Sequence, residues 1–400
     1  MLTGLVTLAL AATPVPPAAV AVSFDREGGV GTLVVEGQAD RAAGRLLTPD
    51  DPVRIASVSK LVVALGVMRL VEAGQLDLDR DVSAYLGWRL RAPAYPDKPV
   101  TLALLLGHRA GLTDNVNYAL PLDSDLEAVL KDPQAWDAAR PPGGDFTYAN
   151  LNYPVVAAVI EAATGERFDA AMARLVLQPL NLDACFNWTT CSDDAVSRAV
   201  VLYGADGSVQ RDDLNGQRPA CPVVPATDGS CDVAAYRLGR HGAGFSPQGG
   251  LRISANGLAR IGVMLLRRGD GFLKPESLAR LQAMAPVHPT SGEGTGGFFC
   301  EYGAAMHSTG GPALADPACR DDLFGDGRLR LGHSGDAYGL RSGLWFDLER
   351  GQGIAYFVTQ VPEGQKGKRS AYSAAEEALV DTARAGHPDA SPLASPAGAH

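Results

Sequence analysis

The most constraining feature of this 400-residue sequence is the stretch RIASVSKLVVALGVMRLVEAG, residues 54–74. Between Leu61 and Val71 the only strongly polar residue is Arg69, so the stretch predicts a helix that is apolar on nearly every side. Such a helix is buried in the body of a large domain. Lys60 stands in its first turn, and an unpaired lysine is costly to bury. We therefore expect Lys60 to have either a polar partner or a chemical role.

The composition fits a globular chain with a sizeable core, because 46% of the residues are hydrophobic and 20% are charged. The net charge of −10 and the absence of a basic cluster argue against a nucleic-acid partner, which would need grouped Lys and Arg. Outside the first residues no 18-residue apolar run occurs, so we expect no integral membrane span.

The first residues, 1–14, combine an apolar run with the small-residue pattern Ala9-Leu10-Ala11, which resembles a secretory signal and its cleavage site. A basic n-region is missing, so a mis-assigned start codon and a plain N-terminal anchor are alternatives. The segment nevertheless favours a secreted or periplasmic protein.

Six cysteines fall into three close couples, without a C-x-x-C motif or a neighbouring paired histidine, so neither zinc nor another metal is predicted. Six cysteines allow 15 pairings, and six separate buried thiols are a further alternative. Closing short surface loops is the simplest arrangement, and it gives 185–191, 221–231 and 300–319. Disulfides would also indicate an oxidising compartment.

The order of the predicted elements places strands at both ends of the chain. Residues 18–24 and 31–37 are β-rich runs split by an Asp/Gly turn and predict a hairpin. LRLGHSG, SGLWFDL and GIAYFVTQ predict three late strands, followed by a closing helix up to residue 386. We expect the early and late strands to share one antiparallel sheet.

Between these strands, residues 77–179 are mostly helical in periodicity, and 185–241 predict an extended loop region held by disulfides. A helix capped by Ser254 follows. We therefore expect an α/β (α+β) fold in which an antiparallel sheet is flanked by helices and a second, helical lobe encloses a cleft.

The predicted organisation is an N-terminal segment, one large domain and a tail. The segment covers residues 1–14, the domain 15–385 and a disordered tail 386–400. Within the domain we expect a sheet lobe at about 15–60 and 245–385, and a helical and loop lobe at about 61–244.

Ser57 and Lys60 lie three residues apart, so a helix would bring the ammonium within reach of the hydroxyl. A serine hydroxyl is a poor nucleophile until a base accepts its proton, and a desolvated lysine with a lowered pKa can be that base. S-x-x-K alone is a weak pattern, yet it occurs only once among six lysines. The alternative is a lysine that reaches the surface.

Tyr148-Ala149-Asn150 stands just before a predicted helix. Tyr148 can shuttle a proton near a cationic lysine, and Asn150 can hydrogen-bond both Lys60 and a substrate carbonyl or amide. Taken alone, a helix-capping Asn150 and a core Tyr148 would be the better interpretation. Likewise His333, in the sequence His333-Ser334-Gly335, would alone be a bonded core histidine, while Gly335 lets a substrate approach the strand.

The three motifs SxxK, YxN and HxG, separated by about 90 and 185 residues, together resemble the serine β-lactamase-related hydrolases in their class C-like branch. That branch includes family VIII carboxylesterases, D-aminopeptidases and D-alanyl-D-alanine carboxypeptidases. VTLALLLGHRAGL, ATGERFDAAMARLVLQPLNL and GGLRISANGLARIG are similar to further segments of the family, and the resemblance covers residues 18–385.

The resemblance implies a β-lactamase/transpeptidase-like fold, no cofactor, and roles for particular residues. Ser57 is the acylated nucleophile, and Lys60 and Tyr148 exchange its proton. Asn150 orients the substrate, and His333 supports Tyr148 and the substrate where lactamases usually carry lysine. Ser334 and Gly335 complete the third motif.

The oxyanion hole implied by the resemblance is formed by the backbone N–H groups of Ser57 and Asp336. The family's THTSG segment is replaced by residues 107–111, GHRAG, which affects the expected local loop structure. Asp336 stands where a small or hydroxylic residue is commoner. Its carboxylate would repel acidic substrates unless strand alternation turned it away from the cleft.

The expected activity is hydrolysis of an ester, an amide or a D-amino-acid peptide, because a neutral His333 supplies no permanent cation for a β-lactam or peptide carboxylate. The alternatives are a class C-like β-lactamase or DD-carboxypeptidase, and a penicillin-binding sensor that is acylated once. A different fold is also conceivable, an α/β-hydrolase that uses GHSGD as its nucleophile elbow and HGAG at His241 as its oxyanion loop. Against it, the elbow motif requires glycine at its fifth position, where the sequence has Asp336, and the only histidines after Ser334 lie in the tail.

Overall fold

The computed structural model describes residues 16–287 and 296–386. The predicted signal within residues 1–14 and the predicted disordered tail from residue 387 onward lie outside the described residues. The predicted secreted or periplasmic location stays a prediction. Across the described ranges, no helix combines the length and the apolar character that crossing a membrane requires.

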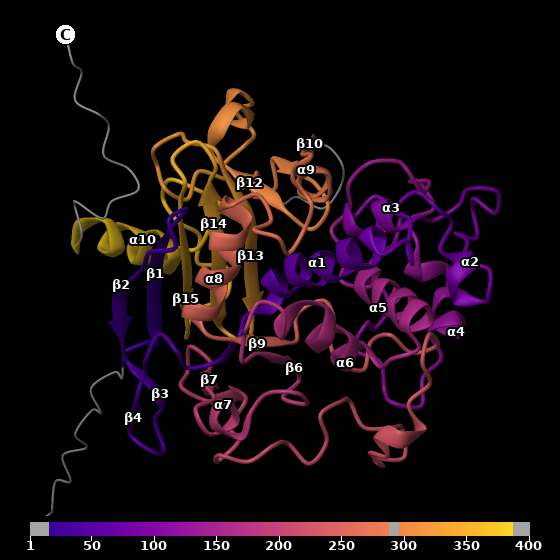
Figure 1. The fold of residues 1–400 in the computed structure, drawn as a ribbon, viewed down its shortest axis with the longest axis horizontal. Coiled ribbons are helices and arrows are strands. Elements are labelled where there is room, and N and C mark those ends of the chain that lie inside the picture. Colours follow the sequence, from indigo (N-terminus) through magenta and orange to yellow (C-terminus); the bar gives the residue numbers. More distant parts are fainter. Residues whose placement is uncertain (1–15, 288–295, 387–400) are drawn as a thin grey trace, which may run out of the picture.

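An eight-stranded antiparallel sheet forms one half of the molecule (Figure 1). Its strands in spatial order are β10 (Ala285–Pro286), β11 (Glu301–Tyr302), β12 (His307–Thr309), β13 (Arg330–Ala337), β14 (Leu340–Asp347), β15 (Gln352–Val358), β1 (Ala19–Asp25) and β2 (Val30–Glu36). The predicted hairpin is confirmed by the β1–β2 pairing, and β1 also pairs with β15. The early and late strands therefore share one sheet, as the sequence indicated.

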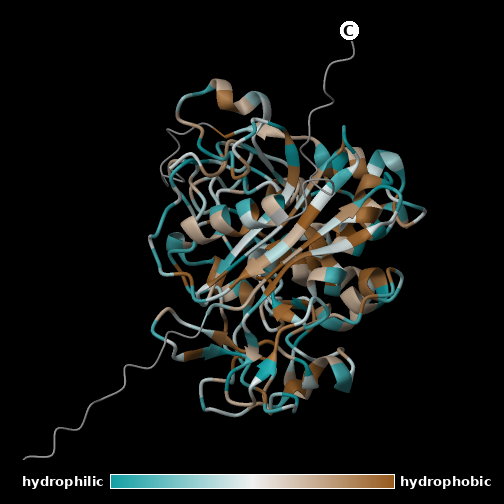
Figure 2. Cartoon of the chain, turned by 90° about the vertical axis from the view of Figure 1, so that its left-hand side faces the viewer, coloured by the Kyte–Doolittle hydropathy of each residue, from teal (hydrophilic) through white to brown (hydrophobic). Residues whose placement is uncertain are grey.

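Two helices cover the two faces of this sheet. Alternate residues of β1 face opposite sides, so Val20 and Val22 join the core cluster that includes α8 (Ala255–Leu266), whereas Ala19 and Ala21 join the cluster that includes α10 (Ala374–Gly386). Figure 2 shows the apolar strands running through the middle of the molecule between helices. Ser254 caps α8, as predicted, by accepting a hydrogen bond from Gly257 N.

The opening stretch forms the predicted buried helix, α1 (Ser59–Glu72), which enters the second lobe beside α5 (Asn152–Thr164). Ten successive residues of α1, from Ser59 to Met68, are buried. The remaining helices are α2 (Ser83–Leu86), α3 (Leu102–Leu106), α4 (Leu126–Leu130), α6 (Phe168–Met172), α7 (Asp193–Ser197) and α9 (Pro275–Gln282).

Single turns of other helix types also occur, namely η1 (Ala56–Val58), η2 (Pro133–Ala135), the π-helical η3 (Ala173–Leu177), η4 (Val233–Ala235) and η5 (Gly311–Ala315). Residues 77–179 are thus less helical than predicted, since α2, α3 and α4 are short and irregular chain connects them. Turn residues in these connections end each apolar run early.

Three small sheets lie beside the main one. They pair β3 (Gln38–Asp40) with β4 (Arg45–Leu46), β5 (Val53–Arg54) with β9 (Leu251–Ile253) and β6 (Cys185–Phe186), and β7 (Leu202–Tyr203) with β8 (Val209–Arg211). The predicted loop region therefore contains short strands as well as irregular chain. All three disulfides, Cys185–Cys191, Cys221–Cys231 and Cys300–Cys319, follow the predicted local pairing.

Replacing each cysteine pair with alanine should lower the free energy of unfolding by about 2–4 kcal/mol, because the unfolded chain regains loop entropy. The Cys300–Cys319 pair, which closes the longest loop at 19 residues, should give the largest loss, and Cys185–Cys191, at 6, the smallest. Denaturant unfolding measures these differences. Six reactive thiols in the oxidised, denatured protein, or the reverse ranking, would contradict the expectation.

Candidate active site

The predicted nucleophile lies where β5 passes through η1 into α1. Ala56 adopts a left-handed backbone conformation, with φ of 48°, one residue before Ser57. This conformation is costly for a residue with a side chain. It turns the chain sharply between strand and helix, and Ser57 lines the large cavity beside it.

The Lys60 amine is fully buried and has three oxygen atoms around it. Its Nζ donates to Ser57 Oγ at 2.9 Å, to Asn150 Oδ1 at 2.8 Å and to the backbone oxygen of Gln248 at 2.9 Å. Burial lowers the pKa of Lys60 to about 7, while the Asp114 carboxylate acts in the opposite direction. The predicted partner of Ser57 is therefore in place, and a surface-reaching lysine is ruled out.

Tyr148 and Asn150 come from the segment that leads into α5, and both line the same cavity as Ser57. Burial raises the pKa of Tyr148 well above its ordinary value, while the neighbouring Ser57 hydroxyl acts in the opposite direction. Asn150 does not cap the helix, because Leu151 occupies that position. The structure thus brings both members of the YxN motif to the Ser57–Lys60 pair.

The Tyr148 ring is held between two other aromatic rings. His108 stacks on it with ring centroids 4.4 Å apart, and Phe299 stacks at 5.0 Å. His108 Nδ1 also accepts a hydrogen bond from Ala149 N at 3.1 Å. His108 belongs to the altered GHRAG segment, so the loop that the sequence left in doubt positions the tyrosine.

Asp114 was not singled out by the sequence. One of its carboxylate oxygens accepts hydrogen bonds from Asn150 N and Nδ2, both at 2.9 Å, and the other accepts from Leu151 N at 3.0 Å. These contacts fix the Asn150 amide so that its oxygen faces Lys60. The only signal in the sequence is that Asp114 follows shortly after the noted segment GHRAGL.

Strand β13 carries the third motif against the nucleophile. A Cβ atom on Gly335 would lie 2.4 Å from Ile55 O and 3.2 Å from Ser57 N, so only glycine allows this approach. Ser334 also lines the cavity, and its backbone N donates to His307 Nε2 at 3.2 Å. The sequence did not identify His307 as a neighbour of the site.

His333, the first residue of the third motif, is expected to support Tyr148 and the substrate. It is fully buried and is absent from the residues that line the cavity. Its Nδ1 lies 2.5 Å from Ser334 O, which can only accept, so Nε2 accepts from the Tyr302 hydroxyl at 3.0 Å. Its ring centroid is 6.4 Å from that of Tyr148. The structure therefore places His333 beside Tyr148 but outside the cavity lining, and its predicted role in supporting Tyr148 and the substrate stays a prediction.

Asp336, in contrast, lines the cavity and is exposed, so strand alternation does not turn it away as the sequence allowed. Its carboxylate forms an ion pair with Arg341. The negative charge that would repel acidic substrates is thereby offset. The cavity as a whole has a volume of about 1130 Å³.

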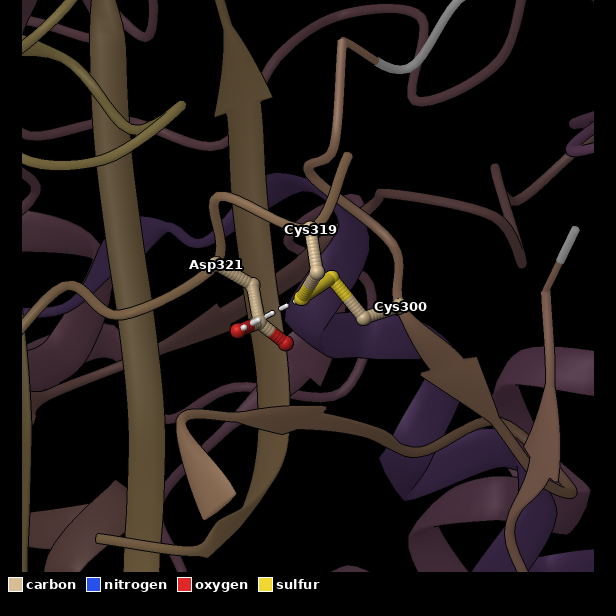
Figure 3. Close-up of side chains that lie close together, drawn as sticks. All are labelled: Cys300, Cys319 and Asp321. Atoms are coloured by element: carbon tan, nitrogen blue, oxygen red, sulfur yellow. Dashed lines mark hydrogen bonds between the residues drawn. A yellow bond between two sulfur atoms is a disulfide. The ribbon is translucent and has the colours of Figure 1, made fainter. Parts of the chain in front are cut away.

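Among the described residues, one group has the proximity expected of metal ligands, namely Cys300, Cys319 and Asp321 (Figure 3). The two sulfur atoms are joined in a disulfide. A cysteine binds a metal as a thiolate, so this group offers no ligand set while the disulfide is intact.

The elbow alternative fails on geometry. A nucleophile elbow places its serine on a sharp strand-to-helix turn, whereas Ser334 lies inside the continuous strand β13. His241 contacts Pro121 O at 2.8 Å, and it does not line the cavity.

Comparison with protein families agrees with this geometry, since the family model described as Beta-lactamase matches residues 13–379. The chain belongs to the β-lactamase family. The predicted resemblance to its serine hydrolases is thus confirmed.

Individual relatives and solved structures resemble the chain at low sequence identity. Esterase EstB from Burkholderia gladioli is 32% identical over 61% of this chain and 64% of its own length, and penicillin-binding protein 4 from Amycolatopsis lactamdurans is 32% identical over 42% and 44%. The alignments thus span less than two thirds of either relative.

The D-amino acid amidase from Ochrobactrum anthropi SV3 superimposes with a TM-score of 0.64 at 19% identity, covering 94% of this chain and 95% of that structure. The penicillin-binding protein homologue from Pyrococcus abyssi gives 0.63 at 21%, covering 92% and 73%. These likenesses confirm the predicted fold.

Replacing Asp114 with asparagine should lower the pKa of Lys60 further, because the Asp114 carboxylate is the charge that raises it. The rate at which a fluorophosphonate labels Ser57 should rise with pH through about 7 in the natural protein, as Lys60 loses its proton. In Asp114→Asn this rise should move to lower pH, with a lower plateau because Asn150 is less firmly held. A rise displaced to higher pH would contradict the assigned electrostatics.

Proposed function

We propose that the protein hydrolyses esters or amides through an acyl-enzyme on Ser57, with carboxylesterase or D-amino-acid amidase and peptidase activity as the fitting types. The observation that carries the proposal is the 2.9 Å contact between the buried Lys60 amine and Ser57 Oγ. A lysine whose pKa is lowered to about 7 by burial is matched to general-base work near neutral pH.

The surroundings of Lys60 fit its neutral form. A neutral amine has two N–H donors and one lone pair. Asn150 Oδ1 and Gln248 O can only accept hydrogen bonds, so they take the two donors. The lone pair then faces the Ser57 hydroxyl, which can donate. This arrangement prepares the proton of Ser57 for transfer to Lys60.

In the proposed acylation, Ser57 Oγ attacks the acyl carbonyl carbon while its proton passes to Lys60. Burial raises the pKa of Tyr148, so the phenol keeps its proton at neutral pH and gives it to the departing alcohol or amine. Lys60 then returns a proton to Tyr148. In deacylation a water molecule attacks the carbonyl carbon of the acyl-Ser57 ester and gives a proton to the Lys60–Tyr148 pair. Ser57 Oγ then leaves and takes a proton back from that pair.

The oxyanion hole is proposed at the backbone N–H groups of Ser57 and Asp336. The close packing of Gly335 on the backbone of Ser57 supports it, because it brings the end of β13 beside the nucleophile. Donors fixed in this way stabilise the negative charge that develops on the substrate oxygen in the transition state. In other enzymes, removing one such donor raises the activation free energy by about 2.7–4 kcal/mol.

Two observations support an ester over a β-lactam. EstB, an esterase, is among the relatives at 32% identity. At the position of the third motif, where lactamases usually carry lysine, this chain also has no cation, since burial and its neighbours hold the pKa of His333 well below its ordinary value. We therefore expect short-chain activated esters to be cleaved, D-amino-acid amides to be weaker candidates, and β-lactams to turn over slowly.

The test is a panel of 4-nitrophenyl acetate, 4-nitrophenyl butyrate, nitrocefin and a D-Ala-D-Ala peptide, measured as kcat/KM. The esters should exceed nitrocefin. Ser57→Ala should abolish hydrolysis and fluorophosphonate labelling, whereas the matched serine variant Ser334→Ala should retain measurable labelling.

Three outcomes would contradict the proposal. Nitrocefin efficiency well above that of the esters would favour the class C-like β-lactamase, and efficient D-Ala-D-Ala cleavage with inert esters would favour the DD-carboxypeptidase. Stoichiometric labelling without turnover of any substrate would indicate the sensor.

A further inference from the structure

Arg54 is a buried cation without an ion-pair or hydrogen-bond partner at the edge of the active-site cavity. It ends β5, three residues before Ser57, and only 8% of its surface is exposed. Its Nε is buried without a hydrogen bond. Neither a hydrogen bond nor an ion pair joins its guanidinium to any residue in 16–287 or 296–386, yet the side chain lines the cavity together with Ser57.

The nearest carboxylate is already used by another arginine. Arg252 lies opposite Arg54 in the β5–β9 register. It donates to both carboxylate oxygens of Asp212, at 3.1 and 2.8 Å, and Trp188 Nε1 donates to Asp212 at 3.0 Å. Asp212 therefore pairs with Arg252. It also attracts Arg54 electrostatically, but two buried guanidinium groups share this one carboxylate.

A second arginine adds positive charge on the same wall. Arg54 Cζ lies 5.1 Å from the centroid of the Tyr338 ring, and Arg211 Cζ lies 4.9 Å from it. Arg211 also donates to the Tyr338 hydroxyl at 3.1 Å and is otherwise exposed. Burial, with Arg252 next in effect, lowers the pKa of Arg54 to about 10, so it remains charged at neutral pH.

The other carboxylates on the cavity wall have partners of their own. Asp336 is paired with Arg341. Glu376 accepts hydrogen bonds from the hydroxyls of Tyr356 and Ser373. The wall around Arg54 therefore carries one carboxylate, Asp212, for the three guanidinium groups of Arg54, Arg211 and Arg252, and its net charge is positive.

We propose that Arg54, assisted by Arg211, binds a carboxylate of the substrate, so that the preferred ester or amide carries a carboxylate group away from the bond that is cleaved. The proposal rests on the proposed hydrolase function and names its substrate class. Burying a guanidinium without a partner is costly, and a carboxylate matches its planar set of donors. The substrate supplies the second anion that these arginines lack.

The test compares two esters of similar length, mono-4-nitrophenyl adipate, which ends in a carboxylate, and 4-nitrophenyl hexanoate, which does not. The natural protein should show a kcat/KM at least tenfold higher for the adipate ester. In Arg54→Met this ratio should fall about tenfold or more, and Arg54→Lys should give an intermediate ratio because it keeps the charge but loses the fork.

Two further variants make the test specific. Arg211→Gln, at an exposed position, should lower the ratio about threefold and carries the test if Arg54→Met fails to fold. Lys366→Gln removes a cation from the exposed rim of the same cavity and should leave the ratio unchanged. An equal ratio in all proteins, or an equal loss in Lys366→Gln, would overturn the proposal.

Binding separates this proposal from the hydrolase function. Adipate titrated calorimetrically into Ser57→Ala should bind at least tenfold more tightly than into Ser57→Ala/Arg54→Met. If the natural protein cleaves neither ester, the proposed function fails while this difference still supports the carboxylate site. Equal adipate affinities would overturn the site even if both esters are cleaved.

Discussion

The buried amine of Lys60 is the group around which the parts of this structure meet. Its three hydrogen-bond partners come from η1, from the segment before α5 and from the segment before β9. Moving a charged ammonium out of water is expensive, and the protein reduces that cost by lowering the pKa of Lys60 to about 7. The same burial that disfavours the charged ammonium leaves Lys60 as a neutral amine, which can act as a base beside Ser57.

The rest of the fold brings these segments together and leaves space in front of them. The antiparallel sheet holds β13 against the nucleophile turn, where Gly335 allows backbone contact. The helical lobe supplies Tyr148, fixed between His108 and Phe299, and Asn150, fixed by Asp114. Rigid side chains of this kind retain their geometry without a substrate, which is the condition for efficient catalysis.

Local patterns carried much of the prediction. The spacing of Ser57 and Lys60, the hairpin of β1 and β2, and the three disulfides all depend on residues close in sequence. By contrast, the contacts of Asp114, Gln248 and Arg54 arise only when distant segments pack together, and no short motif marks them. The burial of His333 outside the cavity lining also could not be predicted, because the direction of a strand side chain depends on which face of β13 packs on the aromatic cluster.

The most direct test of this account is the pKa of Lys60 itself, measured by NMR titration of the protein labelled with 13Cε-lysine. The chain has only six lysines, so six signals are expected, and Lys60→Arg identifies the one of interest. The account predicts that this signal titrates near pH 7. A Lys60 signal that titrates only near pH 10, the ordinary value for a lysine, would contradict it.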